Sequence, residues 1–268
     1  MKISNDCITL VKYKDKDVLP IKERKKVYIP DRYVKSRKNF FRGIDPEKHI
    51  HVAETSLVEQ YYDRTQTPEE ADFALIFIES PLTDCGYTPT DLENGGNGYV
   101  PITLQYRPYT ATSAREVSIA GGDFREPSNN RSYKNKTTYC ANESDLDLVL
   151  NTKKIMKDKP VIVVLRMHNP TVLSELEPYA DAIFVDFGVQ QQAIFDLVSG
   201  IAEPSALLPV ELPANMETVE QHCEDVPFDM EVYTDTCGNA YQYAFGMNWN
   251  GVITDDRTKR YDKNKEKL

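Results

Sequence analysis

The segment KPVIVVLRMHNPTVLSELEPYADAIFVDFGVQQQAIFDLVSG, residues 159–200, decides the fold of this chain. β-branched runs at 159–167 and 181–188 alternate with helical patterns at 169–180 and 189–200. The apolar runs are too short for buried helices and suit strands that are covered on both faces. Strands and helices that alternate with short connections predict parallel pairing and right-handed crossovers.

The ends of these elements carry the expected signals. Asn169 is suited to cap the first helix, and Pro170 to occupy its first turn. Gly200 is suited to end the second helix. A third short strand, bordered by prolines, is expected at 205–213.

The upstream sequence extends the same pattern. Strands are expected at 25–30, the first of the chain, and at 71–79, and helices at 56–64 and 144–157, the last capped by Ser144. The prediction is an α/β fold with a three-layer, open, mostly parallel sheet of about five strands that has helices on both faces.

The middle of the chain differs in composition. Residues 80–139 are rich in Gly, Asn, Pro, Thr and Tyr and predict a long irregular insertion that is functional or packs on something else. One aromatic strand is expected at 240–249. We expect one α/β domain at 1–255, which includes the insertion, and a charged, disordered tail at 256–268.

The composition narrows the classes of function. The 268 residues include 42 acidic and 32 basic side chains, a net charge of −10, so a nucleic-acid partner is not expected. The sequence has no membrane-spanning run and no signal-peptide core, which predicts a cytoplasmic protein as it stands, or a periplasmic or secreted one for a longer parent. The five cysteines form no C-x-x-C pair, and neither a metal nor a cofactor is expected.

Ligands of open parallel sheets bind beyond the carboxyl ends of the strands. Three loops leave those ends: one begins at Glu79 and holds Asp84 and Tyr87, and the others are 166–169 and 188–190. Their carboxylates, imidazole, amides and guanidinium fit a polyhydroxylated ligand.

Each candidate also has a purely structural interpretation. Glu79 could simply end a buried strand, and Asp84 could be an ordinary turn residue. His168 could be a surface residue, and Tyr87 could be a packed aromatic side chain. The residues alone leave both interpretations open.

The segment 159–213 resembles the C-terminal α/β-sandwich domain of glycoside hydrolase family 3, the β-glucosidase and β-xylosidase family. The Lys-Pro-Val-Ile strand, the Ala-Asp-Ala-Ile strand and the Gly-x-x-x-Pro-Ser-x-x-Leu-Pro-Val segment follow the order of the family. Looser similarity extends over most of residues 1–255 and is carried by CITLVKYKDKDVLPIKERKKVYIP (7–30), ADFALIFIESP (71–81), GGNGYVPITLQYRPYTA (95–111) and YQYAFGMNWNGVI (241–253).

This resemblance implies a place in a glycosidase. In the family a (β/α) barrel supplies the aspartate nucleophile, and the α/β domain covers the cleft and in many members contributes the general acid/base glutamate from the loop after an early strand. In some members that loop reads Glu-x-Pro-Tyr-x-Glu, and its second Glu is the acid/base. The corresponding stretch here is Glu79-Ser80-Pro81-Leu82-Thr83-Asp84, so Asp84 stands in for the acid/base, with Glu79 as the alternative. Tyr87, His168 and Asn169 are the candidate substrate-binding residues.

The barrel itself is absent from this sequence, which has no eightfold β/α series. A retaining glycosidase needs two carboxyl groups about 5 Å apart, so we expect a barrel domain in cis or in trans, a carbohydrate such as a β-glucoside as substrate, and no turnover by the chain alone. The alternatives are a non-catalytic carbohydrate-binding or protein-interaction module and, from topology only, a flavodoxin-like nucleotide binder.

Overall fold

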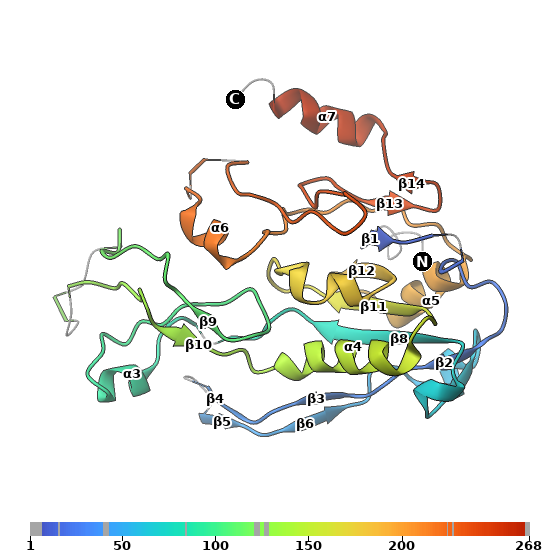
Figure 1. Cartoon of the computed structure of the whole chain (residues 1–268), viewed down its shortest axis with the longest axis horizontal. Coiled ribbons are helices and arrows are strands. Elements are labelled where there is room, and N and C mark those ends of the chain that lie inside the picture. The colour runs from blue at the N-terminus through green and yellow to red at the C-terminus, as the bar shows by residue number, and fades with distance from the viewer. Residues whose placement is uncertain are drawn as a thin grey trace.

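A computed structural model describes residues 7–15, 17–39, 43–83, 85–120, 124–125, 129–223, 225–226 and 228–265. Its centre is an eight-stranded sheet in the order β14-β13-β1-β12-β11-β8-β2-β7 (Figure 1). The strands of this sheet are β1 (Ile8–Tyr13), β2 (Lys26–Tyr28), β7 (Asp63–Thr65), β8 (Phe73–Glu79), β11 (Val161–Arg166), β12 (Ala182–Asp186), β13 (Met247–Asn248) and β14 (Gly251–Val252).

The strands β12, β11, β8, β2 and β7 run parallel, whereas β1, β13 and β14 are antiparallel to their neighbours. The predicted α/β fold with a mostly parallel sheet is confirmed. The helices of the chain are α2 (Thr55–Val58), α3 (Pro89–Glu93), α4 (Glu143–Met156), α5 (Gln191–Ser199), α6 (Met216–Gln221) and α7 (Asp256–Lys265).

Burial explains the central strands. All residues of β12, and β11 from Val161 to Leu165, are buried, as expected for strands covered on both faces. The helix α4 lies in front of β8 in Figure 1. The helix α5 packs through Phe195, whose ring centroid lies 6.5 Å from that of Phe77 in β8. The predicted end of α5 is confirmed, because Gly200 follows it with φ +77°.

The helix predicted at 169–180 is wrong. This segment forms two separate 3-10 turns, η2 (Leu173–Glu175) and η3 (Glu177–Tyr179). Pro178 lies in the second turn, and proline lacks the N–H that would extend an α-helix. Asn169 therefore caps no helix; its N–H faces Ser80 Oγ at 3.4 Å.

The strand predicted at 205–213 is also wrong. Leu208 and Leu212 donate their N–H groups to the carbonyls of Phe245 and Tyr241 at 2.7 and 3.0 Å. The prolines at 209 and 213 have no N–H, so these contacts do not grow into a ladder.

Both ends of the chain differ from the prediction. The strand β1 precedes the segment 25–30 and inserts between β12 and β13, although its sequence was not predicted as a strand. At the other end, the aromatic strand expected at 240–249 is reduced to β13. The helix α7 occupies Asp256–Lys265, where a disordered tail was expected.

Two helix predictions need smaller corrections. The segment 56–64 forms the single turn α2 and then enters β7. Ser144 does not cap α4, because Asn142 lies at the N-cap position and Ser144 Oγ donates to the carbonyl of Tyr33. The position of α4 itself agrees with the prediction to within a residue.

The insertion packs against the rest of the chain. Its regular elements are α3 and the short pair β9 (Tyr109–Thr110) and β10 (Thr137–Thr138). Tyr106 is fully buried in the main core, and a second apolar cluster joins Tyr109 to Val172 and Met216. The insertion is therefore anchored at several points, whereas the domain limit at residue 255 stays a prediction.

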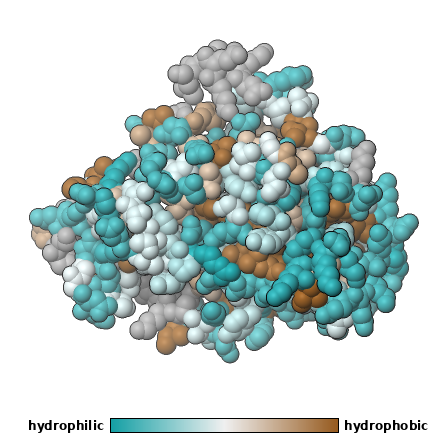
Figure 2. Space-filling model, viewed as in Figure 1, coloured by the Kyte–Doolittle hydropathy of each residue, from teal (hydrophilic) through white to brown (hydrophobic). Residues whose placement is uncertain are grey.

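The remaining strands form two small hairpin pairs, which are β3 (Arg32–Val34) with β6 (Lys48–Ile50), and β4 (Arg37–Asn39) with β5 (Gly43–Asp45). On the face shown in Figure 2, apolar residues form separate patches among hydrophilic ones. Within the described ranges, no helix has the length and apolar character needed to cross a bilayer.

Candidate functional site

Three parallel strands end in charged residues at the same level of the sheet. Glu79 of β8 is in register with Arg166 of β11, and Arg166 is in register with Asp186 of β12. Arg166 Nε donates to Asp186 Oδ2 at 3.2 Å, and Asp186 Oδ1 accepts the N–H groups of Gly188 and Val189 at 2.8 and 2.9 Å. Buried apolar strands thus present a charged row at the edge where ligands of such sheets bind.

Arg32 of β3 joins this row from outside the main sheet. Its Nε and Nη2 donate to Asp145 Oδ1 and Oδ2 at 2.9 and 2.7 Å, and its Nη1 lies 3.1 Å from Glu79 Oε1. The side chains of Arg32 and Asp145 are 4% and 1% exposed, whereas that of Glu79 is 26% exposed. The guanidinium therefore connects a buried carboxylate to one that reaches the surface.

Asp145 and its neighbours also fix the backbone at Glu79. Asp145 Oδ2 accepts from Asn142 Nδ2 at 2.9 Å and from the N–H of Glu79 at 3.2 Å. The carbonyl of Glu79 accepts from Tyr106 Oη at 2.7 Å and Asn142 Nδ2 at 3.0 Å. Burial raises the pKa of the Asp145 carboxyl, and the hydrogen bonds from Arg32 act in the opposite direction. Glu79 is consequently held in place through both its main chain and its side chain.

A hollow of about 180 Å³, here called the edge pocket, opens at this row. It combines carboxylates, guanidinium groups, an imidazole and an amide with an apolar floor. Such a lining can accept hydrogen bonds from the hydroxyl groups of a neutral ligand and can donate hydrogen bonds to them. The residues that line it are Arg32, Ile50, His51, Val52, Phe77, Ile78, Glu79, Val164, Arg166, Asp186, Gln191 and Ile194.

Two of the predicted substrate-binding residues lie next to Glu79. His168 is half exposed, and its Nε2 lies 4.0 Å from Glu79 Oε2. The N–H groups of His168 and Asn169 both face Ser80 Oγ, at 3.0 and 3.4 Å, so one hydroxyl holds the loop after β11 against the loop after β8. Both side chains are exposed at this turn. Their roles in binding stay predictions.

The other two predicted residues are placed differently. Asp84 lies outside the described residues. Tyr87 packs edge-on against Tyr99, with ring centroids 5.3 Å apart, and is not among the residues that line the edge pocket. A Cβ at Gly98 would lie 2.5 Å from the Tyr87 ring, so this glycine makes room for the pair. Tyr87 is thus at least a packed aromatic residue of the insertion.

Sequence reasoning missed Arg32, Asp145, Asp186 and Gln191. Asp186 carried a usable signal, because it closes an apolar run as Glu79 does. Arg32 and Asp145 carried none, since they are far apart in the sequence and meet only when β3 packs on α4. Among the described residues, no group of three or more His, Cys, Asp or Glu side chains could hold a metal ion.

Comparisons with known proteins confirm the resemblance of this α/β domain to the C-terminal domain of glycoside hydrolase family 3. No family model matches the chain. The chain is 38% identical over 91 residues, 34% of its length, to the protein named "Probable beta-glucosidase C" of Aspergillus flavus, of which the match covers 14%.

A second curated relative is beta-glucosidase C of Emericella nidulans, which is 29% identical over 159 residues, 57% of this chain and 24% of the relative. Among solved structures, a GH3 beta-glucosidase of Bifidobacterium adolescentis matches 92% of this chain and 35% of its own, with a TM-score of 0.51 and 14% identity. At that identity the structural match shows the fold. The chain matches less than a quarter of the length of either curated relative.

Proposed function

We propose that this chain is the C-terminal domain of a retaining β-glycosidase and forms one wall of its active-site cleft. The observation that carries the proposal is the charged row Glu79, Arg166 and Asp186 at the carboxyl edge of a sheet whose fold is shared with β-glucosidases. The substrate class is a β-glucoside or a similar neutral carbohydrate, which fits the mixed polar lining of the edge pocket.

Within this proposal, Glu79 and Asp84 have different roles. Glu79 Oε1 is engaged with the Arg32 guanidinium at 3.1 Å, and a carboxylate held in this way is suited to accept sugar hydroxyl groups. A general acid must instead carry a proton when the glycosidic bond breaks. We therefore assign Asp84 as the acid/base and Glu79 as a hydroxyl acceptor, with Glu79 as the alternative acid.

The nucleophile belongs to a second domain. Retaining hydrolysis needs a carboxylate about 5 Å from the acid/base, and by resemblance to the family an aspartate of a (β/α) barrel supplies it, in cis or in trans. The insertion supports the presence of a partner at this side. Val117, Ile119 and Phe124 of the insertion are 72%, 73% and 93% exposed, and exposed large apolar side chains of one segment are candidates for an interaction site.

A complementation assay tests the proposal. The barrel domain of a related β-glucosidase, expressed without its own α/β domain, is mixed with this chain and assayed on 4-nitrophenyl β-D-glucopyranoside. We expect hydrolysis only in the mixture. If the chain binds sugar but restores no hydrolysis, the carbohydrate-binding alternative is correct instead.

Substitutions assayed in the same mixture distinguish the roles of Asp84 and Glu79. Asp84→Asn should lower kcat/KM for cellobiose by about 10²–10⁴-fold, the usual contribution of general acid catalysis. It should lower the value much less for a 2,4-dinitrophenyl glucoside, whose leaving group needs little protonation. Glu79→Gln should lower both values by a similar factor. Negligible losses from both variants would remove these assignments.

A further inference from the structure

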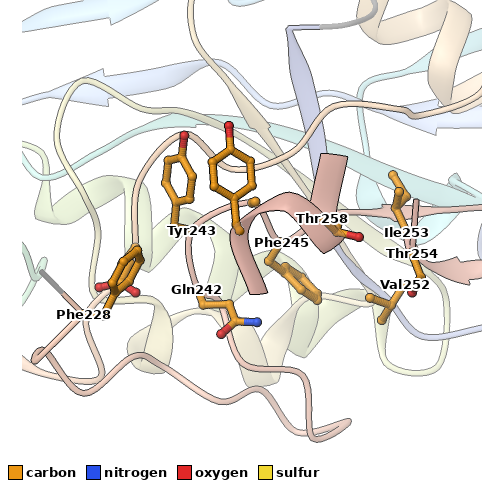
Figure 3. Close-up of a pocket in the computed structure, with 11 residues that line it drawn as sticks. Phe228, Gln242, Tyr243, Phe245, Val252, Ile253, Thr254 and Thr258 are labelled. Carbon is orange, nitrogen blue, oxygen red and sulfur yellow. The ribbon is translucent and has the colours of Figure 1, made fainter. Parts of the chain in front are cut away.

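A second pocket lies at one end of the strand order, where β13 and β14 meet α7. It has a volume of about 160 Å³ and is here called the aromatic pocket. Its lining comes from the segment before β13, from the strand β14 and its continuation, and from α7 (Figure 3). The residues that line it are Glu211, Phe228, Gln242, Tyr243, Ala244, Phe245, Val252, Ile253, Thr254, Thr258 and Tyr261.

This pocket is separate from the edge pocket. Three strand-to-strand steps lie between β14 and β12, the strand nearest to it that lines the edge pocket, which corresponds to roughly 14 Å at the usual spacing of neighbouring strands. The lining residues of the two pockets do not overlap. A ligand at one of them is therefore out of reach of the side chains that line the other.

The side chains of the aromatic pocket have a defined chemical character. Four aromatic rings are accompanied by a carboxylate, an amide and two threonine hydroxyl groups. In the view of Figure 3, Gln242 lies between the rings of Phe228 and Phe245. Among the described residues that line the pocket there is no Lys, Arg or His, so the lining offers no cation to a phosphate or carboxylate.

The backbone around this pocket is unusual. Phe228 and Ala244 both have φ +63°, and both line the pocket. Residues other than glycine seldom adopt positive φ, and a bulky residue that does so is a strong outlier. Such strained positions concentrate at ligand sites, where the surrounding structure holds them in place.

The helix α7 completes one wall through Thr258 and Tyr261. The rings of Tyr243 and Tyr261 meet edge-to-face with centroids 4.8 Å apart. Arg257 Nη1 donates to the carbonyl of Ser205 at 2.8 Å and attaches the start of α7 to the domain. A predominantly charged helix is thus held over the pocket by a few specific contacts.

We propose that the aromatic pocket binds a single pyranose ring of a neutral carbohydrate. The apolar face of a sugar ring packs against aromatic side chains, and its hydroxyl groups find the amide, carboxylate and hydroxyl groups of the lining. The volume is below the roughly 300–1,000 Å³ of pockets for drug-sized ligands, and therefore suits one ring. This site goes beyond the proposed hydrolytic function, which concerns the edge pocket.

Trp249 provides a readout, because it is the single tryptophan of the chain and lies in the connection to β14, the strand that contributes Val252 to the pocket. Its fluorescence is followed while the full chain is titrated with methyl β-D-glucopyranoside. We expect a saturable change, with an affinity that falls at least about tenfold in Phe228→Ala and in Gln242→Ala. Glu79→Gln, in the edge pocket, should leave the affinity within about twofold of the original value.

Circular dichroism melting checks that each variant is folded, and Gln242→Ala serves alone if Phe228→Ala does not fold. No saturable change would overturn the proposal, as would a loss of affinity in Glu79→Gln without one in the pocket variants. Choline is titrated in parallel, and a response to choline in place of the sugar would indicate a site for a quaternary ammonium ligand and overturn the proposal. The complementation assay measures hydrolysis independently, so failure here leaves the proposed function untouched.

Discussion

At the level of single residues, Arg32 connects the two carboxylates on which the candidate site depends. Its guanidinium pairs with Asp145, which is buried, and with Glu79, which reaches the edge pocket. Burying charged groups costs free energy that only close pairing and further hydrogen bonds offset. Loss of Arg32 would therefore leave Asp145 buried without its cation and release the side chain of Glu79.

We predict that Arg32→Met lowers the free energy of unfolding by about 3–5 kcal/mol, the range for breaking a buried ion pair at one partner. Denaturation in urea measures the change. Arg24→Met is the matched control, since Arg24 Nε lies 2.7 Å from Asp63 Oδ1 but both side chains are more than half exposed. Arg24→Met should lower the free energy of unfolding by less than about 1 kcal/mol. Equal losses in the two variants would contradict the structural role of Arg32.

Cys140 should differ from the other cysteines in its reactivity. It is buried, its Sγ lies 2.9 Å from the carbonyl oxygen of Tyr106, and burial raises the pKa of its thiol to about 12. The thiolate is the reactive form, so at pH 8 the folded protein should react with Ellman's reagent at its exposed thiols and not at Cys140. The exposed thiols are those of Cys7, Cys85, Cys223 and Cys237.

The same shift has a consequence for stability. The unfolded thiol ionises near pH 8.5, whereas the folded Cys140 thiol stays protonated up to about pH 12. The contribution of the Cys140 thiol to the free energy of unfolding is complete below pH 8.5 and is lost as pH rises towards 12. Cys140→Ala should therefore flatten the alkaline limb of the stability curve. An unchanged limb, or rapid labelling of Cys140, would show that the thiol is not buried as described.

At the residue scale, sequence reasoning located Glu79 because a carboxylate that interrupts an apolar run at a strand end is visible in one dimension. It also located His168, which the structure brings to 4.0 Å from Glu79. It could not locate Arg32, because the partners of a buried cation are set by packing between distant segments. The role of Asp84 stays a prediction.

At the scale of elements, the residue that ends helix α5 has to be glycine for two reasons, its backbone conformation and its packing. Gly200 ends the helix with φ +77°, and a Cβ there would lie 2.7 Å from Pro20 Cβ. Gly238 has a similar φ of +86° but nothing within 4 Å of the same position. The two glycines therefore share backbone strain and differ in packing.

We predict that Gly238→Ala lowers the free energy of unfolding by about 1–2 kcal/mol, the cost of a left-handed conformation for a residue with a Cβ. Gly200→Ala should lower the free energy of unfolding by about 1–3 kcal/mol more than Gly238→Ala does, because the added methyl group is too close to Pro20. Thermal and urea denaturation of the two variants give the comparison. A smaller loss at Gly200 than at Gly238 would contradict the close contact between α5 and the segment that follows β1.

The elements that the sequence predicted well are the strands β8, β11 and β12, which are continuous apolar runs, and the helices α4 and α5, which have clear end signals. The failures have physical reasons. Pro178 breaks the helical pattern at 169–180 into 3-10 turns, and two prolines keep 205–213 from forming a ladder. The strand β1 was missed because it pairs antiparallel to β12, outside the repeating pattern of strand and helix.

At the scale of the molecule, we propose that the parallel sheet and the insertion together form one side of a site. The insertion is anchored by Tyr106 in the main core, yet it leaves Ile119 73% and Phe124 93% exposed. Composition alone indicated that residues 80–139 were irregular, but it could not show which side chains pack inward and which remain at the surface. The exposed ones are where we expect the barrel domain to dock.

Hydrolysis by the isolated chain is the most direct test of this account. Purified protein of residues 1–268 is incubated with 4-nitrophenyl β-D-glucopyranoside, and the release of 4-nitrophenol is followed. Because the proposed nucleophile lies in another domain, we predict a rate no higher than that of buffer. Turnover at ordinary enzymatic rates that is abolished by a substitution within this chain would contradict it.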